Sequence, residues 1–199
     1  MKILAFSDVH MNVGFMQQVV VHSAAADVVV AAGDSANKGG SARLVIELLA
    51  KIKKPVVMVS GNHDNLMELT KLCDEVAHIH LLHGSGIHID GIDFYGLGCE
   101  VPRRNEENWN EWLSEEAAAR MLGDCPKGGV LISHSPAYGF CDLQIYGANE
   151  GSEAILKCVK NKQPKLHLCG HIHNAWGVSS RIGDTPTHNL GPSMNWFEI

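Results

Sequence analysis

The amino-acid sequence predicts an α/β fold in which a sheet with an antiparallel portion is covered by helices on both faces. In the first half of the chain, apolar runs of strand length alternate with amphipathic segments of helix length. In the middle, short runs separated by Gly or Asp are typical of hairpins. Strands that are apolar on both faces indicate a sheet buried between helices. With 199 residues the chain can form one sizeable core, and we expect a single domain over residues 1–199.

The first third of the chain is expected to form three strands and two helices. Short apolar runs predict the strands Lys2–Phe6, Val28–Ala32 and Pro55–Val59. The spacing of apolar residues predicts helices over Asn12–Ala25 and Ser41–Lys53. We expect Ser41 to cap the second helix, because a serine hydroxyl accepts a hydrogen bond from a free N–H of the first turn.

The middle of the chain is expected to be antiparallel. Turns containing Gly or Asp separate three short strands that we interpret as hairpins: Ile79–Leu82, Ile87–Ile89 and Ile92–Leu97. A polar loop, Val101–Asn110, leads into a helix over about Asn110–Leu122, for which Ser114 offers an alternative start. Trp109 and Trp112 could cover a functional site or anchor this helix in the core, and we favour the anchoring role.

The alternation of strand and helix then resumes towards the C-terminus. We expect strands over Gly129–Ile132 and Lys165–Cys169, a helix over Ser152–Lys162 between them, and two closing strands over Trp176–Arg181 and Thr187–Leu190. No internal repeat or low-complexity tract interrupts the pattern.

Composition argues against several classes of protein. The formal net charge is −6, from 22 acidic and 16 basic residues, whereas a nucleic-acid binder is expected to carry a basic face. No apolar run is long enough for a signal peptide or for crossing a bilayer, so we expect no membrane association. The six Cys are scattered without a Cys-X-X-Cys pair, which favours reduced thiols and a cytoplasmic location.

Five short motifs, each directly after a predicted strand, carry most of the metal-ligating side chains. They are Asp8-Val9-His10, Gly33-Asp34, Gly61-Asn62-His63-Asp64, Ser133-His134 and Gly170-His171-Ile172-His173. Loops that leave the carboxyl ends of strands in α/β sheets converge on one edge, where ligands bind. We therefore expect residues from Asp8 to His173 to meet in space.

The residue types in these motifs favour a pair of divalent ions. A carboxylate such as Asp34 can bridge two ions because it has two oxygens, and Asn62 adds a neutral carbonyl oxygen. Asp8 and His10 lie two positions apart, so on an extended segment their side chains would point the same way. Mixed nitrogen and oxygen ligands suit Mn, Fe, Zn, Ni or Co. Together the motifs predict a two-metal centre for phosphate ester chemistry.

The order and approximate spacing of the five motifs resemble those of the calcineurin-like metallophosphoesterase superfamily, over nearly the whole chain. The resemblance implies a four-layer α/β/β/α double β-sandwich of mixed sheets flanked by helices. It also implies that a bridging Asp34 joins two ions, the first held with Asp8, His10 and His173 and the second with Asn62, His134 and His171.

The resemblance further implies how such a site acts. A hydroxide between the metals attacks phosphorus, His63 stabilises the transition state or protonates the leaving oxygen, and Asp64 orients His63. We expect a phosphodiesterase with two divalent transition-metal ions, Mn first among them, and a small phosphate ester as substrate. The alternatives are a phosphomonoesterase, acting on small molecules or phosphoproteins, and a non-catalytic scaffold on the same fold.

Three further residues are weaker candidates for contact with substrate. Asn12 directly follows the first motif, Arg103 lies in the polar loop, and His188 follows the last motif. Arg suits bidentate contact with phosphate, but a turn, a solvated loop and a structural histidine are the simpler interpretations of these residues. The sequence leaves the substrate, the metal and the oligomeric state open.

Overall fold

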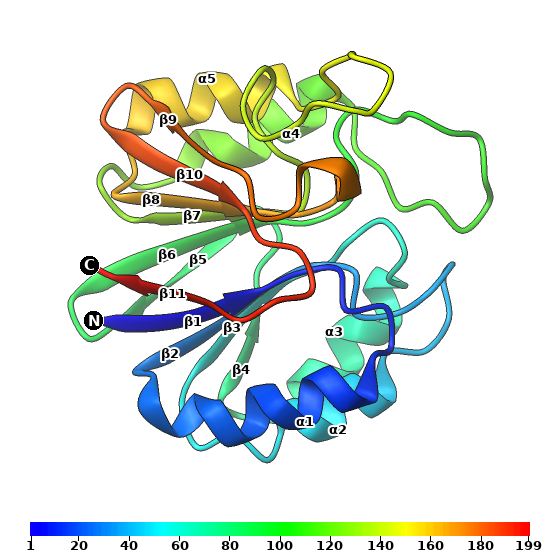
Figure 1. Ribbon diagram of the computed structural model, residues 1–199, viewed down its shortest axis with the longest axis vertical. Helices are drawn as coiled ribbons and strands as arrows, with labels where there is room; N and C mark the ends of the chain where they lie inside the picture. The colour runs from blue at the N-terminus through cyan, green and yellow to red at the C-terminus, as the bar shows by residue number, and fades with distance from the viewer.

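The computed structural model describes residues 1–199 and contains two mixed sheets packed face to face. The strand order is β11-β1-β2-β3-β4 in the first sheet and β5-β6-β7-β8-β10-β9 in the second. Figure 1 shows α1, α2 and α3 against the outer face of the first sheet, and α4 and α5 against the outer face of the second. The expected four-layer α/β/β/α architecture is confirmed.

The first sheet has four parallel strands and one antiparallel edge strand. Its parallel strands are β1 (Lys2–Phe6), β2 (Val28–Ala32), β3 (Val56–Val59) and β4 (Ile79–Leu81), and β11 (Asn195–Glu198) pairs antiparallel with β1. The helices that cover it are α1 (Val13–His22), α2 (Arg43–Leu49) and α3 (Leu66–Asp74).

The second sheet has four parallel strands between two antiparallel edge strands. The parallel strands are β6 (Ile92–Leu97), β7 (Val130–Ser133), β8 (Leu166–Cys169) and β10 (Thr185–Asn189), and the edges are β5 (Ser85–Ile89) and β9 (Ser179–Ile182). The covering helices are α4 (Glu115–Met121) and α5 (Glu153–Lys162). Short 3₁₀ turns cover Ser23–Ala25, Leu122–Asp124 and His173–Ala175.

Alternation along each strand divides the apolar residues among three buried layers. In β1, Ile3 and Ala5 pack between the two sheets, whereas Leu4 and Phe6 pack beneath the helices. In β7, Val130 and Ile132 face the first sheet while Leu131 faces α4 and α5. Successive side chains of a strand point to opposite faces, so a continuously apolar strand supplies two cores at once. This is why the central strands β2 and β3 lack polar positions.

Most of the expected elements are confirmed, with a correction at α2. Its N-cap residue is Ala42, which makes no side-chain capping bond, and the helix begins at Arg43. Ser41 instead accepts a weak hydrogen bond from Arg43 N–H at 3.2 Å and donates to Glu68 on α3. Ser114, the alternative start of the later helix, does cap α4.

The middle of the chain is only partly antiparallel. β5 and β6 form the expected hairpin, closed by Asp90 and Gly91 with φ of 47° and 83°, as a two-residue type I′ turn requires. The hairpin expected for Ile79–Leu82 is wrong, because β4 pairs in parallel with β3 in the other sheet. Two further elements, α3 and β11, were not expected from the sequence.

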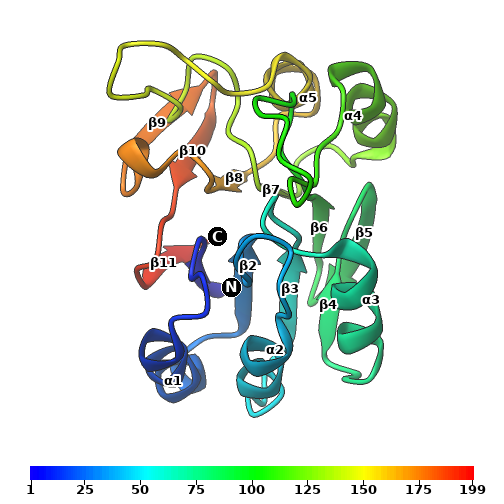
Figure 2. The same cartoon turned by 90° about the vertical axis from the view of Figure 1, so that its right-hand side faces the viewer.

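The parallel strands β1, β2, β3, β7 and β8 all end at the same edge of the molecule. Figure 2 looks onto this edge, where the loops that follow the strands gather between the two helical layers. No helix in the structure is both long and apolar enough to cross a membrane. The fold therefore brings the five motif loops together at one end of the sandwich.

Candidate metal centre

The motif loops adopt a tightly turned backbone rather than an extended one. Asp8, His10, Asp34 and His171 have φ of 54°, 43°, 55° and 68°, in the left-handed region that non-glycine residues seldom occupy. The extended geometry expected for Asp8 and His10 is thus wrong, although both side chains still reach the site. Non-glycine residues in this region cluster at functional sites, where surrounding contacts hold them in place.

Glycines let the loops approach one another closely. A Cβ on Gly61 would lie 1.9 Å from Asp34 Oδ1, and a Cβ on Gly170 would lie 2.4 Å from Asp8 Oδ2. Gly33 combines φ of 96° with a virtual Cβ 2.4 Å from His134 Nδ1. Gly33, Gly61 and Gly170 therefore leave the space that a neighbouring ligand side chain occupies.

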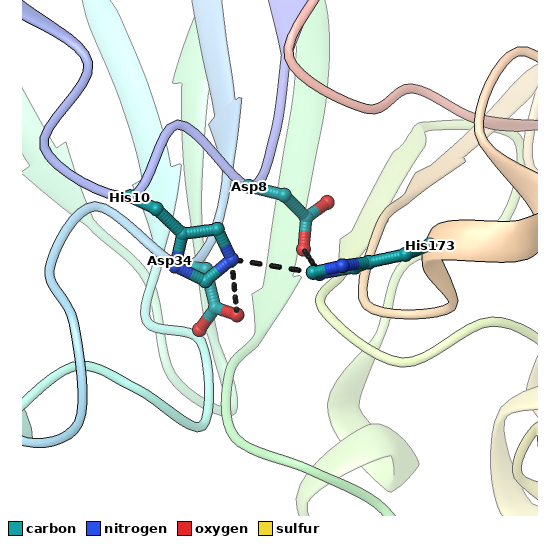
Figure 3. Close-up of side chains that lie close together, drawn as sticks. All are labelled: Asp8, His10, Asp34 and His173. Atoms are coloured by element: carbon teal, nitrogen blue, oxygen red, sulfur yellow. Dashed lines mark hydrogen bonds and ion pairs between the residues drawn. The ribbon is translucent and has the colours of Figure 1, made fainter.

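Asp8, His10, Asp34 and His173 form one group of converging side chains, shown in Figure 3. One ligand atom from each lies within 4.8 Å of all the others. His10 Nε2 lies 3.6 Å from Asp34 Oδ2 and 3.5 Å from His173 Nε2, which in turn is 3.7 Å from Asp8 Oδ1. Two carboxylates and two imidazole nitrogens around one point match the ligand preference of a first-row divalent ion.

A second group converges on the amide oxygen of Asn62. His134 Nε2 and His171 Nδ1 each lie 3.1 Å from Asn62 Oδ1. His134 Nε2 is also 3.5 Å from Asp34 Oδ1. The two oxygens of Asp34 thus face different groups, Oδ2 towards His10 and Oδ1 towards His134. The donor set fits two divalent ions that share this carboxylate.

Backbone carbonyls set the ring orientation of two histidines. His134 Nδ1 lies 2.9 Å from the carbonyl oxygen of Ala32, and His10 Nδ1 lies 3.2 Å from that of Ala36. A carbonyl only accepts, so Nδ1 carries the proton in each ring and Nε2 keeps a free lone pair that points into the site. Such an arrangement is usual for metal-ligating histidines.

Charges in the site act strongly on one another. Burial raises the pKa of Asp34, but His134, His63 and His10 outweigh it, so the pKa lies well below its usual value. Burial lowers the pKa of His134, yet the charge and hydrogen bond of Asp34 raise it to about 10. The buried carboxylate of Asp34 is therefore stabilised by a nearby positive charge, which a divalent ion would supply in place of the proton of His134.

His63 lies at the rim of the first group. Its ring centroid is 4.9 Å from that of His10 and 4.3 Å from that of Trp109. Lys38 N–H donates to His63 Nδ1 at 3.1 Å, and His63 N–H donates to Asp34 Oδ1 at 2.9 Å. Trp109 therefore packs beside the site, and the expectation that it only anchors a helix in the core is wrong.

Asp64 was expected to orient the His63 ring, but its carboxylate makes other contacts. Its two carboxylate oxygens accept backbone N–H bonds from Ala36 and Gly61, both at 2.7 Å. Its side chain is fully buried, and burial raises its pKa, with a further increase from the charge of Asp34. Asp64 thus joins the loops that follow β2 and β3 and acts on the site through their backbone.

The three weaker candidates are engaged elsewhere. Asn12 caps α1, accepting a hydrogen bond from Phe15 N–H at 3.0 Å. Arg103 pairs with Glu106 at 3.0 Å and lies over the ring of Trp112. His188 Nδ1 lies 2.7 Å from Ser179 Oγ on the neighbouring strand β9. None of the three joins the two ligand groups.

Two residues of the site, Glu100 and Asn110, were not expected from the sequence. Glu100 is 2% exposed, and its Oε1 lies 3.3 Å from His171 Nε2. Asn110 is 7% exposed and accepts a hydrogen bond from Asn62 Nδ2 at 2.9 Å. Glu100 follows β6 at the same edge of the sheet as the motifs, which was an available signal. No sequence pattern pointed to Asn110.

Comparisons with known proteins agree with this geometry. A family model described as calcineurin-like phosphoesterase matches residues 1–175, which include all five motifs. The cAMP/cGMP dual specificity phosphodiesterase of Mycobacterium tuberculosis is 29% identical over 74% of this chain and 48% of its own length. A probable cyclic nucleotide phosphodiesterase of Synechococcus is 23% identical over 79% of this chain and 63% of its own length.

The chain thus spans less than two thirds of the length of either relative. A crystal structure from Thermus thermophilus superposes with a TM-score of 0.78 at 18% identity, covering 98% of this chain and 97% of that one, and it shows the same fold. With the family model matching most of its length, the chain belongs to the calcineurin-like phosphoesterase family.

Proposed function

We propose that this chain is a dinuclear metal-dependent phosphodiesterase. The observation that carries the proposal is the placement of Asp34, whose Oδ2 faces His10 at 3.6 Å while its Oδ1 faces His134 at 3.5 Å. A buried carboxylate between two groups of ligands suits a pair of ions that share it. Bound divalent ions supply charge neutralisation at the phosphoryl oxygens and an activated water at neutral pH.

The ligand side chains of this site fall into two groups, one for each ion. Asp8, His10, Asp34 and His173 would hold the first ion, and Asp34, Asn62, His134 and His171 would hold the second. His173 has a side chain that is 50% exposed, so an extended ester can reach the site from solvent. The open rim suits a small phosphate ester, which needs no deep cleft.

In this proposal His63 protonates the leaving oxygen. Its Nδ1 accepts the Lys38 N–H, so in the neutral ring the proton resides on Nε2. A ring fixed in this tautomer presents an N–H donor, as a general acid requires. The tilted contact with Trp109 limits the rotation of the ring.

Two observations favour diesters over monoesters. Both relatives described above carry names of cyclic nucleotide phosphodiesterases. In addition, the guanidinium of Arg103 pairs with Glu106 at 3.0 Å. A phosphomonoester dianion is typically recognised by such a bidentate cation, whereas a diester carries a single negative charge.

The ligand set and the thiols support two finer proposals. Mixed carboxylate, amide and imidazole ligands suit Mn²⁺, which we propose as the working ion ahead of Fe, Zn, Ni or Co. All six cysteines are free and buried, which supports a reducing compartment such as the cytoplasm. Reconstitution of stripped protein with each ion in turn, scored by kcat/KM, tests the first of these proposals.

Hydrolysis of bis(p-nitrophenyl) phosphate and p-nitrophenyl phosphate tests the function. Protein stripped with chelator should be inactive and should regain diester cleavage when Mn²⁺ is added. Asp34→Asn and His63→Ala should lose most of this activity while remaining folded, whereas Asp90→Asn in the β5–β6 turn and His88→Ala on exposed β5 serve as matched controls. Restored cleavage of the monoester alone would support a phosphatase, and failure to bind any ion would support a scaffold.

A further inference from the structure

Three buried side chains and the partly buried His171 form a closed ring of contacts at the second ligand group. Asn62 Nδ2 donates to Asn110 Oδ1 at 2.9 Å, and Asn110 Nδ2 donates to Glu100 Oε2 at 2.7 Å. Glu100 Oε1 lies 3.3 Å from His171 Nε2, and His171 Nδ1 lies 3.1 Å from Asn62 Oδ1. The ring thus includes two metal-ligand candidates and two residues with no role assigned so far.

The direction of every hydrogen bond in the ring follows from the carboxylate. Ionised Glu100 only accepts, so Asn110 must turn its NH₂ group towards Glu100 and its oxygen towards Asn62. Asn62 must then turn its own NH₂ towards Asn110, which leaves its oxygen facing the site. An amide that could point either way is therefore fixed with its carbonyl oxygen as the metal-facing atom.

The same carboxylate also fixes the tautomer of His171. Nε2 must carry the proton that is donated to Glu100, so Nδ1 holds a lone pair. This lone pair faces Asn62 Oδ1 at 3.1 Å, and Nε2 of His134 lies 3.1 Å from the same oxygen. The three atoms converge on one point, and such a mixed set of nitrogen and oxygen atoms suits a bound cation.

Glu100 is itself held firmly by the loop that follows β6. Its Oε2 accepts a hydrogen bond from Arg104 N–H at 3.0 Å. Its backbone N–H donates to Glu111 O at 2.9 Å and its carbonyl accepts from Leu113 N–H at 2.9 Å. Glu111 N–H in turn donates to the carbonyl of Asn62 at 3.0 Å, so the loop is attached to the β3 motif by backbone as well as side chains.

We propose that Glu100, acting through Asn110, is the positioning residue that sets the hydrogen-bond polarity of the second metal site. The proposal rests on the dinuclear site proposed above and adds the residues that determine which atoms of Asn62 and His171 face the ion. No member of the first group takes part in the ring. The second ion therefore depends on Glu100 and the first does not.

The change Glu100→Gln alters the hydrogen-bonding groups at this position while leaving the shape of the side chain almost unchanged. A glutamine has nearly the same volume, but its amide offers one acceptor where the ring needs two, because His171 and Asn110 both donate to Glu100. Either His171 shifts its proton to Nδ1 or Asn62 turns its NH₂ towards the ion. In both cases one ligand of the second ion is lost, and loss of such a partner typically weakens metal binding by about 10–100-fold.

The test measures Mn²⁺ binding to stripped protein by equilibrium dialysis and by electron paramagnetic resonance. Wild type should bind two ions and show the spectrum of a spin-coupled pair. Glu100→Gln should bind the first ion as wild type does and show the hyperfine pattern of an isolated Mn²⁺, with the second binding step weakened by about 10–100-fold. Glu106→Gln, in the same loop but 92% exposed, should behave as wild type.

An exchanged pair tests polarity directly. In Glu100→Gln with Asn110→Asp, the new Asp accepts from both neighbours and the new Gln accepts from His171, so the second ion should bind more tightly than in Glu100→Gln alone. Wild-type binding of two ions by Glu100→Gln would overturn the proposal. Loss of both ions in Glu100→Gln and in the exchanged pair would also overturn it, because Glu100 would then serve folding in general. Fewer than two ions in wild type would refute the dinuclear function itself.

Discussion

Replacement of Gly61 by alanine tests how closely the β3 loop packs against the bridging carboxylate. The new Cβ would lie 1.9 Å from Asp34 Oδ1 and 2.3 Å from Asp34 N, whereas ordinary contact begins at 3.4 Å. The shift needed at Oδ1 is 3.4 − 1.9, or 1.5 Å. The loop cannot withdraw freely, because Gly61 N–H donates to buried Asp64 at 2.7 Å. The carboxylate of Asp34 must therefore move away from its ligand position.

We expect Gly61→Ala to lower both the free energy of unfolding and the catalytic rate. Overpacking of this kind destabilises a protein by roughly 1–3 kcal/mol. A misplacement of about 1 Å in a reacting constellation can cost on the order of 100-fold in rate. Gly61 has no left-handed φ that alanine would strain, so the effect comes from the contact with Asp34 alone.

Three measurements on Gly61→Ala check this reasoning: kcat/KM for the diester with saturating Mn²⁺, ions bound per chain, and thermal unfolding. Gly123→Ala is the matched control, because a Cβ there meets nothing within 4 Å. It should retain full activity and both ions. Wild-type activity and metal content in Gly61→Ala would refute the claim that this glycine is required for the position of Asp34.

Two other predictions concern residues outside the ligand groups. Burial, with a smaller effect from His188, lowers the pKa of buried His167 to about 3 from 6.5. As the pH falls below about 6.5, the unfolded chain binds a proton at this residue while the folded chain does not. His167 therefore leaves the free energy of unfolding unchanged above about pH 6.5. Between about pH 6.5 and about pH 3 it lowers this free energy by about 1.4 kcal/mol for each pH unit of acidification. Denaturant unfolding of His167→Gln across this range should show a shallower decline than wild type, and equal slopes would contradict the assignment. Asn12→Ala removes the cap of α1 and should cost about 1 kcal/mol of stability with no change in KM; a large rise in KM for the diester would place Asn12 at the substrate after all.

The strands and motif loops were predictable because their signals are local. Val28–Ala32 is apolar at every position, which indicates burial on both faces, and Gly33-Asp34 follows directly. The same pattern does not say what covers each face. Ile3 packs against the second sheet and Leu4 against the helices, yet both are simply apolar in the sequence. The division into two sheets therefore came from the resemblance.

The errors have physical causes as well. The helix α3 begins at a cap residue, Asn65, directly after the third motif, where no helix was expected. The strand β4 was grouped with its neighbours in sequence rather than with β3. The left-handed backbone of Asp8 depends on contacts from other loops, such as the hydrogen bond from its own N–H to Gly33 O at 3.0 Å. Glu100 acts through contacts with residues far away in the chain, so no local pattern identifies its partner.

The most direct test of the dinuclear centre is an anomalous difference map from crystals grown with Mn²⁺. We expect two peaks about 3.5–4 Å apart on either side of the Asp34 carboxylate. One should lie among Asp8, His10 and His173, and the other among Asn62, His134 and His171. A single peak, or no peak at all in protein that is folded and saturated with Mn²⁺, would contradict the account.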